Sequence, residues 1–283
     1  MTILLNRHGW RRPPSGIPRV NKSSRQYIGL IHWWTANARP YSNYMGDRGT
    51  EPIDGSREGG TGNLNKRDHE LGQAIYLTGT TATKINIGNI ELNAPISLAC
   101  WYRPDFTNGT GAQANAAMII KPVTSESNPW YLYYLGHDNA SPAKPFFGVT
   151  DGGLTTGAVA ATTPIKQGRL MHVVGTYTGP NGPMNIYVNG KRENTNISTV
   201  VIGTSNKNTL IGGAVAAWTN NCFKGWIGDV RIYNRALGPH DVSRLYAHET
   251  RWELYAYPNP ADLLLPLLAG GTTANARSHG CIF

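Results

Sequence analysis

The chain has 283 residues, and 40% of them are hydrophobic, which is enough to form a sizeable core in one large domain. Charged residues make up only 15%, and the 33 glycines and 18 prolines are typical of a chain with many strands and turns and few surface helices. Apolar runs stay well below the roughly 18 to 20 residues of a membrane-spanning helix, so a membrane span is excluded. Only Met1 and residues 3–5 are apolar before the chain turns basic, so no secretory signal is expected.

The three cysteines, Cys100, Cys222 and Cys281, lie far apart in the sequence and form no CxxC pair. This pattern predicts free thiols in a chain that is made in a reducing compartment, such as a cytoplasm. A bridge between Cys100 and Cys222 remains open as the alternative.

The formal net charge of +9 is concentrated near the start of the chain. Residues 1–46 contain seven basic residues and no acid, whereas the remaining 19 basic and 17 acidic residues nearly cancel. Three prolines within residues 1–26 disfavour a helix there, so the sequence predicts an extended basic arm. Its candidate partner-anchoring residues are Arg7, Arg11, Arg12, Arg19, Lys22 and Arg25.

Three roles are open for this arm. Its arginines would pair with phosphates if it bound nucleic acid, or lie along an acidic groove if it bound a protein shell. Otherwise the arm is a solvated lead-in. Trp10 is its only aromatic residue, which argues against a nucleic-acid channel and favours the protein shell.

Strand signals begin at residues 27–34, YIGLIHWW, and a long polar loop is expected over residues 35–72. The Asn189-Gly190 pair after MNIYV is the best hairpin signal, because both residues tolerate the positive φ of a type I′ turn. Many short strands at regular spacing predict an all-β antiparallel sandwich or barrel. The expected strands from residue 73 onward fall within 74–79, 84–89, 96–103, 116–121, 130–136, 145–149, 169–177, 184–190, 209–213 and 225–233.

The last of these strands leads into a helix. Alternation predicts that Trp226, Gly228, Val230 and Ile232 share one face of the strand, opposite Ile227, Asp229, Arg231 and Tyr233. Gly238 is then a suitable N-cap, Pro239 suits the first helical position, and Asp241 lies in the first turn, where the helix dipole favours an acid. Val242, Leu245 and Tyr246 follow helical spacing, so a short helix should cover an end of the sandwich.

Three segments in order, RLMHVVGTYTGPNGPMNIYVNGKREN, LIGG and FKGWIGDVRIYNRALGPHDVSRLY, resemble the laminin G-like jelly-roll module of the concanavalin A-like lectin/glucanase superfamily. Gly228 stands where that family has the first of two aspartates, and Asp229 matches the second. The resemblance covers residues 27–250 and implies one large antiparallel jelly-roll sandwich. The fold hosts lectins, hydrolases, adhesion modules and virion proteins, so it does not fix the function.

Catalytic and metal-binding patterns are nearly absent. The superfamily's glucanases carry an E-x-D-x-E strand, which is missing here, so no enzymatic activity is expected and a glycoside hydrolase is the least favoured reading. His172 is read as a packed, hydrogen-bonded strand histidine and not as a metal ligand. No cofactor is expected apart from calcium, which some family members bind and for which Asp138 and Asp151 are the candidate ligands. Turn formation is the simpler role for both, and loop capping is the role expected of Asp229.

Aromatic residues are the candidates for stacking on sugars. Those within apolar strands are expected to fill the core, namely Trp33, Trp34, Trp101, Trp130, Tyr131, Tyr133 and Tyr134. Trp218 differs, because it stands among Gly, Ala and Asn residues typical of a loop, and it is the candidate ligand-binding residue.

Residues 251–283 form an apolar tail after the arm (1–26) and the sandwich (27–250). Leu264, Leu265 and Leu267 are expected to be buried on a partner or on a sister subunit of a homo-oligomer. Arm and tail resemble segments that flank this module in phage-type sequences. The sequence therefore predicts a capsid decoration or surface protein on the virion of a tailed phage, partnered by another virion protein. A carbohydrate-binding adhesion module is the alternative.

Overall fold

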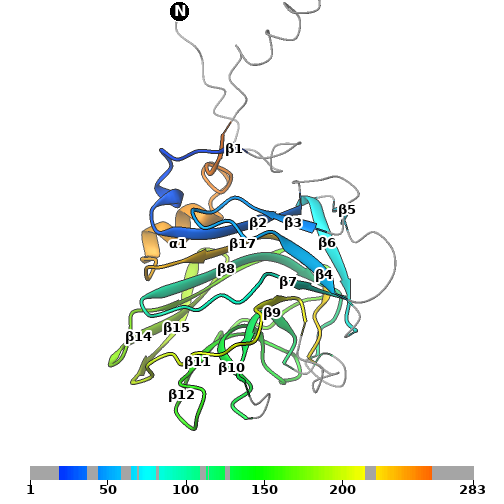
Figure 1. Cartoon of the computed structure of the whole chain (residues 1–283). Coiled ribbons are helices and arrows are strands. Elements are labelled where there is room, and N and C mark those ends of the chain that lie inside the picture. Colours follow the sequence, from blue (N-terminus) through cyan, green and yellow to red (C-terminus); the bar gives the residue numbers. More distant parts are fainter. Residues whose placement is uncertain are drawn as a thin grey trace, which may run out of the picture.

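The computed structural model describes residues 19–36, 44–58, 65–68, 70–80, 83–108, 113, 115–124, 128–213 and 221–256. Over these residues the chain forms two face-to-face antiparallel layers, with one α-helix and a small ladder on the outside of one layer (Figure 1). Hydrogen bonding is continuous across 16 strands and passes from one layer to the other at β3. The predicted jelly-roll sandwich is confirmed. No helix in the described ranges is long and apolar enough to cross a membrane.

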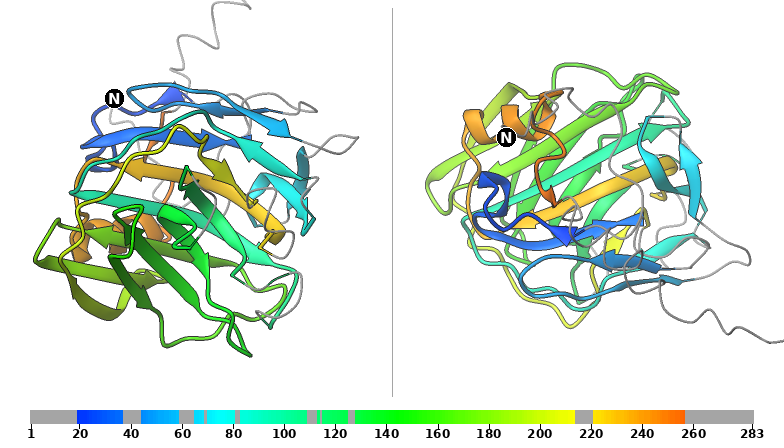
Figure 2. Two further views of the ribbon diagram at one scale, coloured as in Figure 1. Left: turned by 60° about the horizontal axis from the view of Figure 1, so that its bottom comes forward. Right: turned by 90° about the horizontal axis from the view of Figure 1, so that it is seen from above.

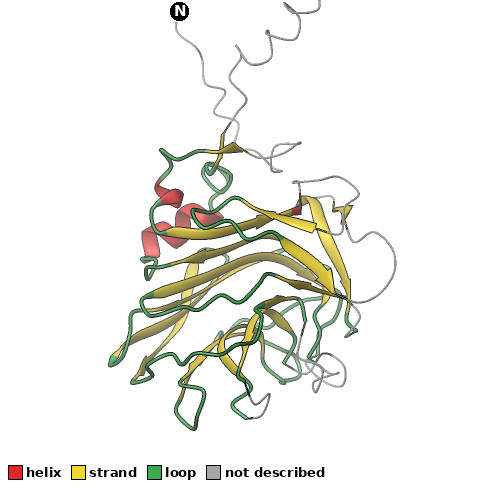
Figure 3. Ribbon diagram, in the orientation of Figure 1, coloured by secondary structure: helices red, strands yellow, loops and turns green. Residues whose placement is uncertain are grey.

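Figure 3 shows the two layers as yellow strands. The first layer consists of β2 (Leu30–Thr35), β5 (Asn65–Asp68), β6 (Gly72–Thr78), β8 (Ile96–Pro104), β13 (Met171–Tyr177), β14 (Gly182–Val188), β15 (Lys191–Ser198) and β17 (Lys224–Tyr233). The second consists of β3 (Tyr44–Asp47), β4 (Gly55–Glu58), β7 (Lys84–Asn86), β9 (Ala117–Pro122), β10 (Tyr131–His137), β11 (Pro145–Thr150), β12 (Thr156–Ala160) and β16 (Leu210–Ile211). In the first layer, β17 lies between β2 and β8, with β13, β14 and β15 beyond β8.

The polar stretch over residues 35–72 is not a single loop, because it contributes the short strands β3, β4 and β5. Close packing explains why this stretch escapes a hydrophobic-pattern analysis. Gly55 of β4 packs so tightly on β7 that a Cβ there would lie 2.7 Å from Ile85 Cγ2. A glycine that brings two backbones together carries no apolar signal of its own.

The main core fills the space between the two layers. Trp34, Leu98, Phe147, Ile186 and other fully buried side chains from both layers meet there. Cys100 and Cys222 are buried free thiols, so a bridge between them is excluded, while Cys281 lies outside the described residues.

A second apolar cluster lies on the outer face of the first layer and is covered by helix α1 (Pro239–Tyr246). Figure 2 shows α1 above this layer. The predicted start of the helix is confirmed, with Gly238 as N-cap, Pro239 first, and Asp241 in the first turn accepting a 2.6 Å hydrogen bond from Arg235. The predicted position is wrong. Val242 and Leu245 pack with Trp33 and Trp101 on the sheet face, and not at an end of the sandwich.

Strand β17 contains a bulge that overturns the predicted alternation. Gly228 faces Trp101 of β8 and Arg231 faces Ala99. Two residues of β17, Asp229 and Val230, therefore lie opposite the single residue Cys100 of β8. The extra residue reverses the faces, as β-bulges do. Ile227, Val230 and Ile232 point into the main core, whereas Trp226 and Tyr233 join the outer cluster. Asp229 takes the positive φ of +53° that the bulge requires.

Asp229 does not cap a loop, contrary to expectation. It is 6% exposed, and its carboxylate accepts two 2.7 Å hydrogen bonds from Arg231, through Nε and through one terminal nitrogen. Its Oδ1 also accepts a 2.6 Å bond from the indole of Trp33. Burial would lower the pKa of Arg231, but Asp229 outweighs it and the pKa is raised above its ordinary value. The Arg231 guanidinium therefore stays charged although it is buried.

Residues 19–26, predicted as part of an extended arm, pack on the sandwich instead. β1 (Arg19–Val20) pairs with β18 (Tyr255–Ala256), and the 3-10 helix η1 (Arg25–Tyr27) follows, capped by Ser24. Gln26 is buried, donates a 2.6 Å hydrogen bond to the carbonyl of Thr250, and accepts one from Arg231. The described part of the sandwich therefore includes residues 19–26. Within it, Lys22 and Arg25 are exposed.

Candidate functional site

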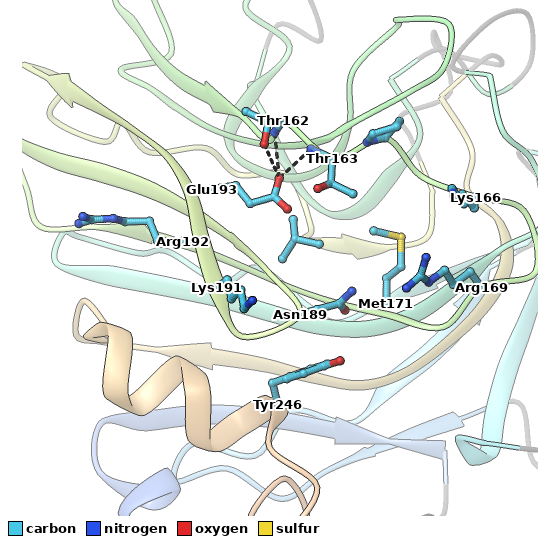
Figure 4. A pocket seen from close by; sticks show the side chains of 12 residues that line it. Thr162, Thr163, Lys166, Arg169, Met171, Asn189, Lys191, Arg192, Glu193 and Tyr246 are labelled. Carbon is cyan, nitrogen blue, oxygen red and sulfur yellow. Dashed lines mark hydrogen bonds between the residues drawn. The ribbon is translucent and has the colours of Figure 1, made fainter.

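An open groove with a volume of about 780 Å³ lies where the loop between β12 and β13 approaches the β14–β15 hairpin (Figure 4). We call it the basic groove. One wall is residues 162–169 of that loop, and the opposite wall is residues 189–193 of the hairpin. Met171 and Val188 lie between the walls, and Tyr246, the last residue of α1, borders the groove. Elements of both layers therefore build it.

The hairpin wall is formed as the sequence predicts. Val188 and Lys191 face each other in the ladder, so Asn189 and Gly190 make a two-residue turn, with φ values of +50° and +80°. These positive values are those of a type I′ turn. A Cβ on Gly190 would lie 3.0 Å from Tyr246, so the glycine also lets the hairpin sit close to the tyrosine.

Glu193 fastens the two walls together. Its Oε2 accepts hydrogen bonds from the backbone amides of Thr162 (2.9 Å) and Thr163 (2.8 Å) and from the Thr162 hydroxyl (3.2 Å), drawn as dashed lines in Figure 4. Further along β15, the amides of Asn194 and Asn196 each donate a 3.0 Å bond to carbonyls of β12. Side-chain bonds thus fix the separation of the walls.

Four cations surround the groove. Lys166 and Arg169 stand on the loop wall, and Lys191 and Arg192 stand on the hairpin wall. All four are exposed, and none of them forms an ion pair with any described residue. Like charges gathered around a concave surface create a positive potential that attracts anions.

Tyr246 supplies an aromatic face at the groove. It is 38% exposed, and its ring stacks on Trp101, with centroids 5.7 Å apart and planes 13° apart. Trp101 in turn contacts the His172 ring at 4.8 Å, and the Arg251 guanidinium lies 5.6 Å from the Trp101 ring. A stacked base of this kind holds the tyrosine in one orientation, as a platform for an apolar ligand face requires.

His172 is a packed strand histidine, as predicted, but its buried Nδ1 has no hydrogen-bond partner among the described residues. It is 2% exposed, and burial, with a smaller contribution from Arg231, lowers its pKa to about 3. The imidazole is therefore neutral at physiological pH and serves as part of the aromatic stack under Tyr246.

The two calcium candidates lie in different loops. Asp138 accepts hydrogen bonds from the amides of Ala140 and Lys144 before β11, and Asp151 accepts them from Gly153 and Thr155 after β11. Hydrogen bonds from Thr155 and Gly153 hold the pKa of Asp151 below its ordinary value. Both residues form turns, and they lie at opposite ends of strand β11. No group of three His, Cys, Asp or Glu side chains that could hold a metal occurs in the described residues.

Most of the predicted core aromatics are buried, namely Trp33, Trp34, Trp101, Tyr133 and Tyr134. Trp130 and Tyr131 are only partly buried. The candidates Arg7, Arg11, Arg12, Trp218, Leu264, Leu265 and Leu267 lie outside the described residues, as does the side chain of Arg19. The sequence does not reveal the groove, because 19 residues separate its two walls and each wall holds only two cations. The one local signal is the Lys191-Arg192 pair directly after the Asn-Gly turn.

Comparison with known proteins places this architecture. The family model described as the concanavalin A-like lectin/glucanases superfamily matches residues 77–243. No curated protein sequence matches the chain.

Three solved structures illustrate the likeness in fold. Domain 4 of AbnA, an extracellular arabinanase of Geobacillus stearothermophilus in complex with arabinotriose, has a TM-score of 0.58 at 18% identity, over 77% of this chain and 98% of that one. The binding domain of Paraclostridial Mosquitocidal Protein 1 has a TM-score of 0.57 at 14% identity, over 78% of this chain and 52% of that one. The binding domain of Botulinum Neurotoxin DC, in complex with SialylT, has a TM-score of 0.55 at 15% identity, over 77% of this chain and 50% of that one.

This chain therefore spans about half the length of the two toxin domains. Identities below 20% show a shared fold and no more. The family model covers more than half of the chain, in the segment that holds both walls of the groove. This chain belongs to the concanavalin A-like lectin/glucanase superfamily.

Proposed function

We propose that this chain is a non-catalytic carbohydrate-binding module and that the basic groove is its glycan site. The observation that carries the proposal is Tyr246, a half-exposed ring on a stacked aromatic base, at the border of a groove with polar walls. Sugar rings have apolar C–H faces and a rim of hydroxyls. An aromatic platform beside several hydrogen-bond donors matches both features.

The single described carboxylate in the groove supports binding without catalysis. Glycoside hydrolysis uses two carboxyl groups about 5 to 9 Å apart. Among the described residues that line the groove, Glu193 is the only acid, and one of its oxygens is already occupied by three donors. This residue holds the walls in place and has no partner carboxylate.

The solved structures of similar fold add support from their own ligands. The arabinanase domain is in complex with arabinotriose, and the other two are binding domains. Lectin-like binding is a common use of this fold, and the proposal assigns it here to a specific surface.

Replacing Tyr246 by alanine will weaken glycan binding about tenfold, equivalent to about 1.4 kcal/mol, because the sugar loses its stacking surface. Binding of glycans selected on an array is measured by titration calorimetry. Tyr246→Phe keeps the ring and should stay within about threefold of wild type, and Leu154→Ala, at a residue 94% exposed on another loop, is the neutral control.

Two results would contradict this proposal. One is equal affinity of wild type and Tyr246→Ala for every glycan bound. The other is turnover of a polysaccharide by the pure protein, which would make the chain an enzyme. Thermal unfolding of each variant shows whether a loss of binding reflects a loss of folding.

We further propose that the module acts on the virion surface of a tailed phage, as a homo-oligomeric decoration protein attached to another virion protein. The support is compositional: the arm holds most of the net charge, and the apolar leucines follow the sandwich. The packing of Gln26 shows where to cut. Deleting residues 1–18 should abolish particle attachment and leave the sandwich folded, whereas deleting 1–26 would also remove a hydrogen-bond partner of Arg231.

Particle attachment is measured by banding native particles on a density gradient and finding this chain by mass spectrometry at a fixed ratio to a major shell protein. A chain that stays in the soluble fraction, or a 1–18 deletion that still decorates particles at full occupancy, would contradict the virion role.

A further inference from the structure

We infer that the basic groove takes an acidic carbohydrate, whose carboxylate or sulfate groups are held between the cations of its two walls. The inference rests on the proposed function and adds the chemical class of the ligand. Its basis is the arrangement of charge: Lys166 and Arg169 on one wall, and Lys191 and Arg192 on the other.

Several cations elsewhere on the sandwich have acidic partners. Lys224 lies 3.3 Å from Asp105, and Arg235 lies 2.6 Å from Asp241. The buried Lys121 lies 3.0 Å from Glu91. No such acid stands beside the four groove cations among the described residues, so their charge is available to a ligand.

The position of Glu193 strengthens this argument. It is the only described acid that lines the groove, and its Oε2 is turned to the amides of Thr162 and Thr163. The Glu193 carboxylate is thus held by backbone amides and forms no ion pair with the described cations of the groove. The five charged lining residues carry a formal net charge of +3, which attracts an anionic ligand.

The geometry favours an acidic sugar over a nucleic acid. Single-stranded nucleic acids bind along extended basic tracks with several aromatic side chains, one for each stacked base. Tyr246 is the only aromatic residue among the described residues that line this groove, and a volume of about 780 Å³ fits a short oligosaccharide. An acidic sugar ring would place its apolar face on Tyr246 and its anionic group against the walls, where arginine can bind a carboxylate or sulfate with two hydrogen bonds.

The experiment compares sugars that differ only in charge. Galacturonic acid oligosaccharides are titrated beside their methyl esters, and sulfated galactose oligosaccharides beside their unsulfated, neutral forms. At least one acidic member should bind at least tenfold more tightly than its neutral counterpart, with an affinity that falls as NaCl is raised. The carboxylate and sulfate arms identify which acid group is recognised.

Paired substitutions locate the site. Each double substitution should weaken binding of the acidic sugar at least tenfold and reduce the salt dependence of that binding. The two are Lys191→Gln with Arg192→Gln on the hairpin wall, and Lys166→Gln with Arg169→Gln on the loop wall. Lys22→Gln with Arg25→Gln is the matched control, because it removes the same charge from exposed positions away from the groove. This control should stay within about twofold of wild type.

The inference is overturned if neutral and acidic members bind equally, if all three pairs weaken binding alike, or if no acidic sugar binds. If only neutral sugars bind, and their binding is lost in Tyr246→Ala, the inference is overturned while the proposed function stands. Tighter binding of single-stranded DNA than of any sugar, lost in the groove variants, would overturn both.

Discussion

Replacing Asp229 by alanine will lower the free energy of unfolding by about 3 to 5 kcal/mol, because it leaves the Arg231 guanidinium buried without a counter-charge. Both side chains of this pair are 3% exposed, and the two are joined at 2.7 Å. The same substitution removes the acceptor of the Trp33 indole. Unfolding in urea, followed by tryptophan fluorescence, measures the loss.

The chain offers a matched control for this variant. Arg244 and Glu253 form a pair at 2.5 Å with both side chains 29% exposed, so Glu253→Ala should cost no more than about 1 kcal/mol. Replacing Asp229 and Arg231 together, by alanine and methionine, should recover part of the loss because no unpaired charge remains. A loss for Asp229→Ala as small as that for Glu253→Ala would show that the buried pair contributes no more than a surface pair.

Lowering the pH from 7 to 5 will reduce the free energy of unfolding by about 4 kcal/mol through two buried histidines. Burial lowers the pKa of both His137 and His172 to about 3. The unfolded chain takes up protons on these residues below about pH 6.5, while the folded chain keeps them neutral. Their stabilising effect is therefore complete above pH 6.5 and is lost progressively as the pH falls towards 3, at about 2 kcal/mol for each histidine by pH 5.

His137→Phe tests this origin directly. The ring of His137 lies among those of Tyr102, Phe106 and Phe223, with centroids 5.2 to 6.0 Å away, so a phenyl ring suits the site. Urea unfolding at pH 7, 6 and 5 should show about half the wild-type slope with pH for this variant. An unchanged slope would mean that His137 does not cause the pH dependence.

The sequence predicts the fold well because local signals and the global fold agree. Asn189-Gly190 can adopt the turn that the hairpin needs, and Gly238-Pro239 can start the helix that the outer face needs. The bulge at Asp229 escapes prediction, because alternation assumes one residue opposite one residue and cannot register an insertion.

The site is harder to predict than the fold. Tyr246 follows the same helical spacing as the buried Val242 and Leu245, so the sequence does not set it apart. Only the folded structure shows that its ring stacks on Trp101 and borders an open groove. The cations of the two walls come together because β12 and β15 meet across the sandwich edge through side-chain amides. Such contacts depend on tertiary packing and leave no periodic pattern in the sequence.

The pairing of β1 with β18 has a mechanical consequence. Arg19 lies opposite Ala256, so the chain enters and leaves the sandwich side by side, on the outside of the first layer (Figure 1). Tension applied through the flanking segments would peel this two-residue ladder and would not shear the long strands of the sandwich.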